Sequence, residues 1–186
     1  NVPIDKLTKD QRNSAKAINF GIVYGMGEYT LSQDLNISFK QAKNYMNEYF
    51  DKYSGVRNYL DFLKKFAHEH GYVKTLMNRI RYIPEINSSN ANMRNFGERA
   101  AMNTPVQGSA ADIMKCAMVR VYNRLKSENL QAQIILQVHD ELIIETPYDE
   151  EDAVKAILKE EMENAVMLNV PLVVEMEVGH SWYDAK

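Results

Sequence analysis

Apolar side chains recur at helical spacing through most of the first 70 residues. The stretch "TKDQ" at 8–11 fits a capping box, a Thr cap with Gln three residues later, and predicts a helix from about Lys9 to 25–27. A short helix at 28–35 follows, and "SFKQ" at 38–41 offers a second capping box. After it, helical spacing continues to Gly71 with an interruption at Gly55, through Ala42, Tyr45, Met46, Tyr49, Tyr53, Val56, Tyr59, Leu60, Leu63 and Phe66. This spacing predicts two further helices.

The pattern then changes to short runs typical of strands. The stretch "YVKTLMNRIRYI" at 72–83 predicts a hairpin that turns around Met77 and Asn78. Pro84 and the polar run at 87–90 form a joint, which is the best candidate boundary between two lobes.

The second half repeats this mixture of helix and strand. A long helix is expected over about 91–126, with a bend near Pro105 and Gly108. A pair of apolar strands within 133–145, a helix at 149–166 and a last strand at 171–178 complete the pattern. Helices and paired strands without a βαβ alternation predict an α+β fold.

Composition fits a soluble globular domain, with 186 residues, 45% of them hydrophobic and 25% charged. Cys116 is the single cysteine, which excludes an internal disulfide and fits a reducing compartment. No apolar run approaches the roughly 20 residues that a membrane span needs, and the first residues lack a signal-peptide layout. A first residue other than Met suggests a fragment or a processed product.

Charge is distributed unevenly along the chain. Residues 1–100 carry 15 Lys and Arg against 10 Asp and Glu, whereas residues 101–186 carry 7 against 15. The overall charge of −3 argues against a nucleic-acid partner, but a basic half joined to an acidic half suggests a polyanion on one side and metal on the other.

Four residues of the first predicted helix form one stripe. Arg12, Lys16, Phe20 and Tyr24 are each four residues apart. Two cations near a helix N-terminus can neutralise phosphate oxygens, and the aromatic rings further on can lie against a base or sugar. This order matches a nucleoside triphosphate, although an amphipathic helix with buried rings and solvated cations would show the same spacing.

Two further groups of polar residues could carry chemistry. Arg99, Asn103 and Gln107 form a second stripe at spacing four, which could line a nucleic-acid groove or simply face solvent. In "QVHDELIIE" at 137–145, His139, Asp140 and Glu141 interrupt an apolar run and would sit at a hairpin tip. A carboxylate fixed between two buried strands is a suitable oxygen donor for Mg²⁺, but one pair of carboxylates is a weak signal.

Several stretches together resemble the bacterial-type DNA polymerase I family, the family A DNA polymerases. The stretch "RNSAKAINFGIVYG" at 12–25 is similar to the family's motif B, Arg-x3-Lys-x3-Phe-Gly-x2-Tyr-Gly. "ERAAMNTPVQGSAADIMK" at 98–115 resembles its long palm helix, and "QVHDEL" at 137–142 resembles its motif C. The hairpin and the ending "VPLVVEMEVGHSW" are also similar, so the resemblance covers nearly the whole chain in order.

The resemblance implies a role for each of these residues. Arg12 and Lys16 would contact the triphosphate, Phe20 the incoming sugar and base, and Tyr24 the nascent base pair or the template position. The residues facing primer–template DNA would be Arg99, Asn103, Gln107, Gln137 and His139, with His139 near the primer end. Asp140 would bind metal with Glu141 in support, and Asp140, Glu141 and Lys16 would be the catalytic residues.

The implied reaction is template-directed DNA synthesis. A primer 3′-hydroxyl would attack the α-phosphate of a deoxynucleoside triphosphate, assisted by two Mg²⁺ ions, and pyrophosphate would leave. The implied partners are primer–template DNA, deoxynucleoside triphosphates and an N-terminal remainder of the polymerase, with no membrane. The implied location is cytoplasmic, at the nucleoid.

The chain departs from the family pattern in three places. Asn78 and Ile80 replace a Gly and one Arg of the family's hairpin, and Asn13 stands where a second Arg is frequent. Motif A, which supplies the other metal-binding Asp, is missing and belongs upstream with the thumb. We therefore expect a fingers subdomain at 1–88 and the C-terminal part of a palm at 89–186, inactive without the remainder.

Two other functions remain open at this point. Single-subunit RNA polymerases share a similar plan, although Phe20-Gly21 and Asp140-Glu141 favour the DNA enzyme. The missing motif A also leaves room for a non-catalytic module that binds nucleic acid or nucleotide.

Overall fold

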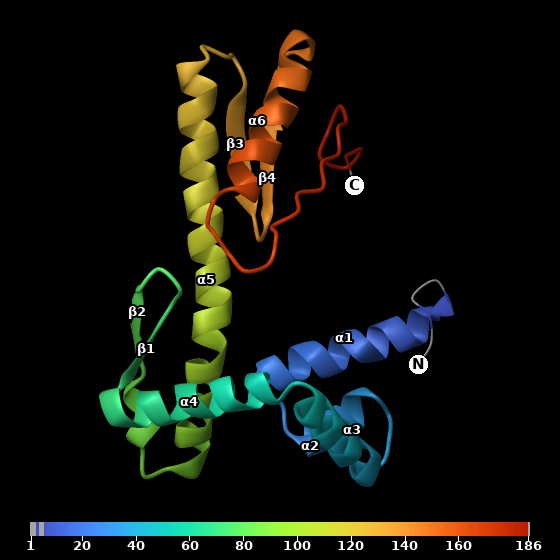
Figure 1. Ribbon diagram of the computed structural model, residues 1–186, viewed down its shortest axis with the longest axis vertical. Coiled ribbons are helices and arrows are strands. Elements are labelled where there is room, and N and C mark those ends of the chain that lie inside the picture. The colour runs from blue at the N-terminus through green and yellow to red at the C-terminus, as the bar shows by residue number, and fades with distance from the viewer. Residues whose placement is uncertain (1–2, 4–5, 186) are drawn as a thin grey trace. The chain divides into compact units, whose positions relative to one another are not determined.

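A computed structural model describes residues 3 and 6–185 of the chain (Figure 1). Its first helices are α1 (Lys9–Val23), α2 (Glu28–Asp34), α3 (Phe39–Lys52) and α4 (Ser54–His70). Next come β1 (Tyr72–Lys74), β2 (Ile80–Tyr82), the 3-10 helix η2 (Pro84–Asn87) and the long helix α5 (Ala91–Ser127). The last elements are β3 (Gln133–Val138), β4 (Glu141–Glu145), the 3-10 helix η3 (Tyr148–Glu150) and α6 (Glu151–Glu163). Many helices with two separate antiparallel strand pairs confirm the predicted α+β class.

The chain forms two compact units that divide within α5. The first unit ends at Gln107 and the second begins at Gly108. Helix α5 continues through Pro105, as the predicted span of 91–126 requires. The expected boundary between fingers and palm at residue 88 concerns functional subdomains and stays a prediction.

Both predicted capping boxes are present. The backbone N–H of Gln11 donates to Thr8 Oγ1 at 3.2 Å, and Gln11 Oε1 accepts from the Thr8 N–H at 3.0 Å. Ser38 and Gln41 repeat this exchange at the start of α3, with distances of 3.3 and 3.0 Å. Each box satisfies two N–H groups that a helix start would otherwise leave unpaired, so both helices begin where the sequence predicts.

The core of the first unit holds α4, the first hairpin and α5 together. One buried cluster joins α4 to the hairpin, η2 and α5 through Ala67, Val73, Ile83, Ile86 and Ala101. Gly97 of α5 permits this packing, because a Cβ there would lie only 2.9 Å from the backbone nitrogen of Ile86. The apolar side chains of α4 are not all part of the core: Leu60 and Leu63 are buried, whereas Tyr59 is exposed.

The first hairpin has the predicted turn. Strands β1 and β2 pair antiparallel, with Tyr72 opposite Tyr82 and Lys74 opposite Ile80. Asn78 adopts a positive φ of 62°, a left-handed conformation that Asn tolerates better than most residues. This explains how the turn forms where the family's hairpin usually has glycine.

In the second unit, the C-terminal part of α5 and α6 pack with the β3–β4 hairpin. Their buried cluster comprises Val121, Leu125, Ala132, Val154 and Ile157, and the hairpin adds Ile134, Leu142 and Ile144. The Glu150 carboxylate fixes the entry to β3 by accepting hydrogen bonds from the N–H groups of Gln131 at 2.9 Å and Ala132 at 3.0 Å.

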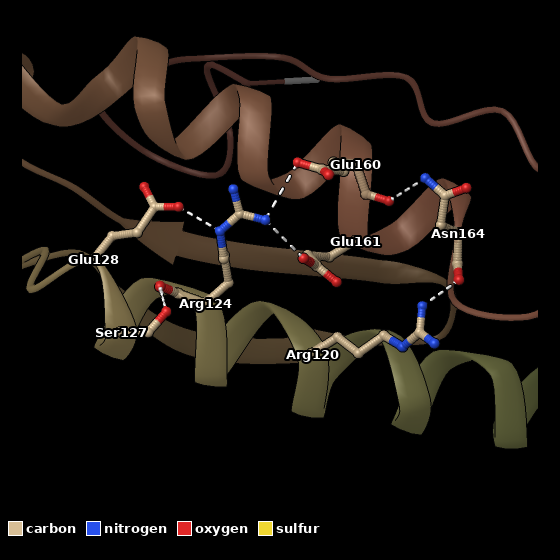
Figure 2. A network of polar contacts seen from close by, with 7 residues as sticks. All are labelled: Arg120, Arg124, Ser127, Glu128, Glu160, Glu161 and Asn164. Atoms are coloured by element: carbon tan, nitrogen blue, oxygen red, sulfur yellow. Dashed lines mark hydrogen bonds and ion pairs between the residues drawn. The ribbon is translucent and has the colours of Figure 1, made fainter.

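A polar network also joins α5 to α6 (Figure 2). Arg124 donates a hydrogen bond to Glu128, which directly follows α5. Its guanidinium also donates to Glu160 at 3.3 Å and to Glu161 at 3.1 Å, both on α6. One turn earlier, Arg120 donates to the backbone carbonyl of Asn164. The hydrogen bonds and charges of these glutamates, with Glu128 first, raise the pKa of Arg124 further above its ordinary value.

The predicted last strand is wrong. Residues 171–178 form no strand, although Leu172, Val174 and Met176 are more covered than the residues between them. The Val174 N–H donates to Glu163 Oε1 at 3.2 Å instead of to a neighbouring strand. A strand needs a ladder of backbone hydrogen bonds, and within the described part of the chain no strand pairs with this segment.

Candidate nucleotide and nucleic-acid site

The stripe on α1 is exposed along its whole length. Arg12 and Lys16 are exposed, and neither forms an ion pair with any residue that the structure describes. The exposed rings of Phe20 and Tyr24 stack on each other, with centroids 6.0 Å apart and planes inclined by 23°. The alternative of a helix with buried rings is therefore wrong. The arrangement offers two free cations followed by a flat aromatic surface.

The glycines after this stripe have a steric role. Gly25 adopts φ +73°, and a Cβ there would lie 2.5 Å from Met102 Cε and 3.0 Å from Arg99 Cγ. A Cβ on Gly21 would lie 2.8 Å from Met26 Sδ. The chain at the end of α1 can therefore approach α5 closely only because Gly25 lacks a side chain, while Gly21 makes room for Met26.

The second stripe begins where the first one ends. Gly25 lies against Arg99, so the aromatic end of the α1 stripe neighbours the start of the α5 stripe. Arg99 and Gln107 are exposed, and Asn103 between them is half-buried. The Asn103 Oδ1 atom is buried and has no hydrogen-bond partner among the described residues. An unpaired buried acceptor costs free energy, so it is a natural point for a donor from a ligand.

Sequence reasoning missed the contact that ties the hairpin to this stripe. Arg81 of β2 donates to Thr104 Oγ1 at 3.0 Å, and the Thr104 hydroxyl donates to the Ala100 carbonyl at 2.7 Å. This places one hairpin arginine against α5 in a fixed position. The only sequence signal was a Thr beside Asn103 in the predicted helix, which is too common to predict such a contact.

A pocket of about 410 Å³, whose wall contains three methionines beside apolar and charged side chains, also lies at the end of α1, and sequence reasoning missed it. Its wall includes Gly25, Met26, Met46 and Met102. Methionine fills irregular spaces and adapts its shape easily, so this support for the aromatic end of α1 is deformable.

The second unit carries the polar hairpin tip that the sequence predicts. Val138 pairs with Glu141, so His139 and Asp140 form a two-residue turn between β3 and β4. His139 takes a positive φ of 51°, and its carbonyl accepts a hydrogen bond from Gln137 Nε2 at 2.6 Å. The Gln137 amide thus supports a turn that has no glycine. Asp140 and Glu141 are both exposed.

The carboxylates at this tip suit a metal site only in part. Asp140 and Glu141 are adjacent, but residues 3 and 6–185 contain no group of three or more His, Cys, Asp or Glu side chains arranged to hold an ion. Mg²⁺ is commonly held by one or two carboxylates, with substrate phosphates and water completing its shell. The tip therefore fits a metal that is shared with a substrate, and not a metal held by these residues alone.

The predicted site residues form two coherent sets. The first unit contains Arg12, Lys16, Phe20, Tyr24, Arg99, Asn103 and Gln107, and the second contains Gln137, His139, Asp140 and Glu141. The structure supplies the geometry of each set, while the individual roles stay predictions. No helix in the described chain combines the length and the apolar character needed to cross a membrane.

Comparison with known proteins gives a consistent result. DNA polymerase I of Caldicellulosiruptor bescii is 57% identical over 185 residues, which cover 100% of this chain and 22% of that protein. DNA polymerase I of Bacillus caldotenax is 52% identical over 182 residues, or 98% of this chain and 21% of that protein. The chain thus spans about a fifth of the length of these relatives.

A solved structure has the same fold. The POL domain of Pol1 from M. smegmatis, in complex with DNA primer-template and dNTP, matches 99% of this chain and 32% of its own with a TM-score of 0.96 and 45% identity. The family model for DNA polymerase family A matches residues 1–184. The chain therefore belongs to DNA polymerase family A.

Proposed function

We propose that this chain takes part in template-directed DNA synthesis, as the portion of a DNA-directed DNA polymerase that binds the incoming nucleotide and part of the DNA. The stripe on α1, with two exposed cations and two exposed stacked rings, carries this proposal. Membership of family A supports it, as does the M. smegmatis relative, whose structure contains DNA primer-template and dNTP. A polymerase of this kind would work in the cytoplasm on the DNA of the nucleoid.

The nucleotide would lie along α1 with its triphosphate toward the N-terminal part of the stripe. Lys16 and Arg12 would donate charge-assisted hydrogen bonds to phosphate oxygens and offset the negative charge that builds up on the departing pyrophosphate. Phe20 would support the sugar and base, and Tyr24 would lie beside the new base pair or the template base.

The primer–template would contact the α5 stripe. Arg99 and Gln107 reach solvent and can donate to phosphate, sugar or minor-groove acceptors. Asn103 has an unpaired Oδ1 that can accept a hydrogen bond, and its amide nitrogen can donate one. Gln137 and His139 would lie close to the primer end.

The reaction would join the primer 3′-oxygen to the α-phosphorus and release pyrophosphate. Asp140 would hold Mg²⁺, with Glu141 in support. When bound, Mg²⁺ would lower the pKa of the primer hydroxyl and stabilise negative charge on the phosphate oxygens. A further carboxylate is needed for two ions, and we propose that an N-terminal remainder of the polymerase with motif A and the thumb supplies it.

The test is single-nucleotide incorporation by a chimera in which this chain replaces the matching segment of the Bacillus caldotenax polymerase. Lys16→Ala should reduce the efficiency of incorporation by a factor of about 100 or more, because it removes a charge-assisted phosphate contact. Lys43→Ala, which removes an exposed cation from α3, is the matched control and should have little effect.

Other outcomes favour the alternative functions. Equal efficiency of the chimera and its Lys16→Ala variant would reject the triphosphate assignment. Extension with ribonucleotides in preference to deoxynucleotides would indicate the RNA polymerase alternative. Tight DNA binding with no incorporation by a well-folded chimera would favour the non-catalytic alternative.

A further inference from the structure

A continuous row of aromatic rings runs along α4 and onto the first hairpin. Tyr59, Phe62, Phe66 and His70 follow one another at spacings of three, four and four residues, which places them on one face of the helix. Consecutive ring centroids along the helix are 6.5, 5.8 and 4.1 Å apart. Phe66 then contacts Tyr72 at 5.5 Å, and Tyr72 contacts Tyr82 at 6.0 Å. The hairpin stands at the C-terminal end of α4 (Figure 1).

Much of this aromatic row faces solvent. Tyr82 is 73% exposed, Phe62 55% and Tyr59 47%. The packing face of α4 is a different one, formed by Leu60, Leu63 and Ala67. The outer rings are therefore not needed to fill the core, and none of them belongs to the stripes on α1 and α5 described above. A large exposed apolar surface of this kind commonly marks a binding site.

The surroundings of the aromatic row are basic. Residues 54–82, which contain the whole row, hold six Lys and Arg and only two Asp and Glu. The Lys74 ammonium lies 5.7 Å from the centroid of the Tyr72 ring. The exposed Lys65 ammonium lies 3.9 Å from Glu69 Oε1, a long surface ion pair that contributes little and that a phosphate can replace. Rings bordered by cations suit a partner with flat apolar groups on a negatively charged backbone.

We propose that the aromatic row binds single-stranded DNA by stacking unpaired bases on its rings while the neighbouring cations contact the phosphates. Bases stack on aromatic side chains without regard to sequence, and phosphates are drawn to Lys and Arg. A duplex hides its base faces, so the row selects single strands. A purely apolar protein partner would gain nothing from the surplus of cations, which is why DNA is the favoured occupant. This surface is separate from the proposed nucleotide site and does not depend on it.

The experiment measures binding of the full chain to a fluorescein-labelled oligothymidylate of about 12 nucleotides, by anisotropy at low and moderate salt. The variant Tyr59→Leu/Phe62→Leu keeps apolar bulk on α4 but removes two exposed ring faces. Its affinity should fall by at least tenfold, since each stacked base contributes about 1–3 kcal/mol. The variant Phe39→Leu/Tyr45→Leu removes rings of similar exposure, 53% and 45%, from α3 and should bind like the unmodified chain.

A second variant tests the charge component. Lys65→Glu/Lys74→Glu should also weaken binding and should make it less sensitive to salt, because fewer counterions are released. Circular dichroism of each variant checks that the helices are retained.

Three results would overturn the proposal. One is equal affinity of the Tyr59→Leu/Phe62→Leu variant and the unmodified chain while both remain helical. Another is equal loss in the α3 control. The third is self-association of the unmodified chain in sedimentation that the leucine variant abolishes without any change in DNA affinity, since the row would then be covered by a second copy.

Discussion

The two units of this chain use charge in opposite ways. Residues 101–107 contain no charged side chain, so the charge counts for residues 1–100 and 101–186 also hold for the two units. The first unit has five more positive than negative charges, and the second has eight more negative than positive charges. In the first unit, Arg12 and Lys16 stand exposed next to exposed rings, and neither pairs with a carboxylate of the described residues. In the second, Arg124 contacts three glutamates (Figure 2), and two of them, Glu160 and Glu161, link α5 to α6. An unpaired cation is available to a ligand, whereas a paired one mainly supports the fold.

The carboxylates of the second unit also fall into two kinds, those engaged in contacts within the fold and those exposed to solvent. Glu160 and Glu161 are engaged by Arg124, and Glu150 accepts backbone N–H groups. Asp140 and Glu141 stand exposed at the hairpin tip. The charged residues that the family resemblance assigns to chemistry are therefore among the exposed charges of each unit.

The largest expected effect comes from removing a free carboxylate. In the chimeric polymerase described above, Asp140→Asn should lower the rate of incorporation by about a thousandfold or more, because the carboxylate that we propose binds Mg²⁺ would be lost. Glu160→Gln removes a carboxylate of the Arg124 network and serves as the control. Its rate should stay within about twofold, and a similar loss in both variants would break the distinction between free and paired carboxylates.

A smaller effect should follow from adding one methyl group at the end of α1. Gly25→Ala forces a Cβ to within 2.5 Å of Met102 Cε and requires a left-handed backbone, so the free energy of unfolding should fall by about 2 kcal/mol. Gly27→Ala is the matched control, since a Cβ there meets nothing within 4 Å. Urea unfolding followed by circular dichroism measures both. Equal stabilities would show that the close approach of α1 to α5 is not required.

The smallest expected effect is a change with pH in the free energy of unfolding, caused by His68. His68 Nε2 lies 3.0 Å from Glu98 Oε1, and Nδ1 lies 3.1 Å from Asn87 Oδ1. The hydrogen bond to Glu98, followed by that to Asn87, raises the pKa of His68 above its ordinary value of 6.5. The charged form is thus favoured in the folded chain, so its stabilisation is complete below pH 6.5 and is lost as the pH rises through the higher folded pKa.

A comparison with His68→Gln measures this loss. The difference in unfolding free energy between the two chains should shrink between pH 6 and pH 8, by less than about 1 kcal/mol because the pair is partly exposed. The Arg124 network should show no such change, since Arg stays charged across this range. Parallel stability curves for the two chains would rule out His68 as the titrating group.

Local signals predicted the local structure well. Capping residues at Thr8 and Ser38 located two helix starts, and the turn residues around Asn78 located the first hairpin. Each of these features depends on contacts within a few residues, which a sequence displays directly. The spacing of Arg12, Lys16, Phe20 and Tyr24 likewise predicted that they share one stripe of the helix, whereas the exposure of the two rings came only from the structure.

Features that depend on distant contacts were not predictable in the same way. The segment 171–178 has a strand-like alternation, but pairing requires a neighbour that a local pattern cannot supply. The exposure of Tyr59 and Phe62 was also missed, because aromatic residues at helical spacing are usually part of a core. The link from Arg81 to Thr104 joins residues 23 positions apart, and a Thr beside Asn103 is too common a feature to predict it.

The methionines around the end of α1 have a consequence for the redox chemistry of the protein. Met102 is buried against Gly25, and Met26 lies against Gly21. Oxidation to the sulfoxide would add a polar oxygen where even a methyl group does not fit, and would disturb the support beneath Phe20 and Tyr24. Peroxide should therefore impair the aromatic end of α1 through the thioethers of Met26 and Met102, while the single thiol of the chain, Cys116, lies in the other unit. Thiol reductants would not reverse such damage, whereas methionine sulfoxide reductases would.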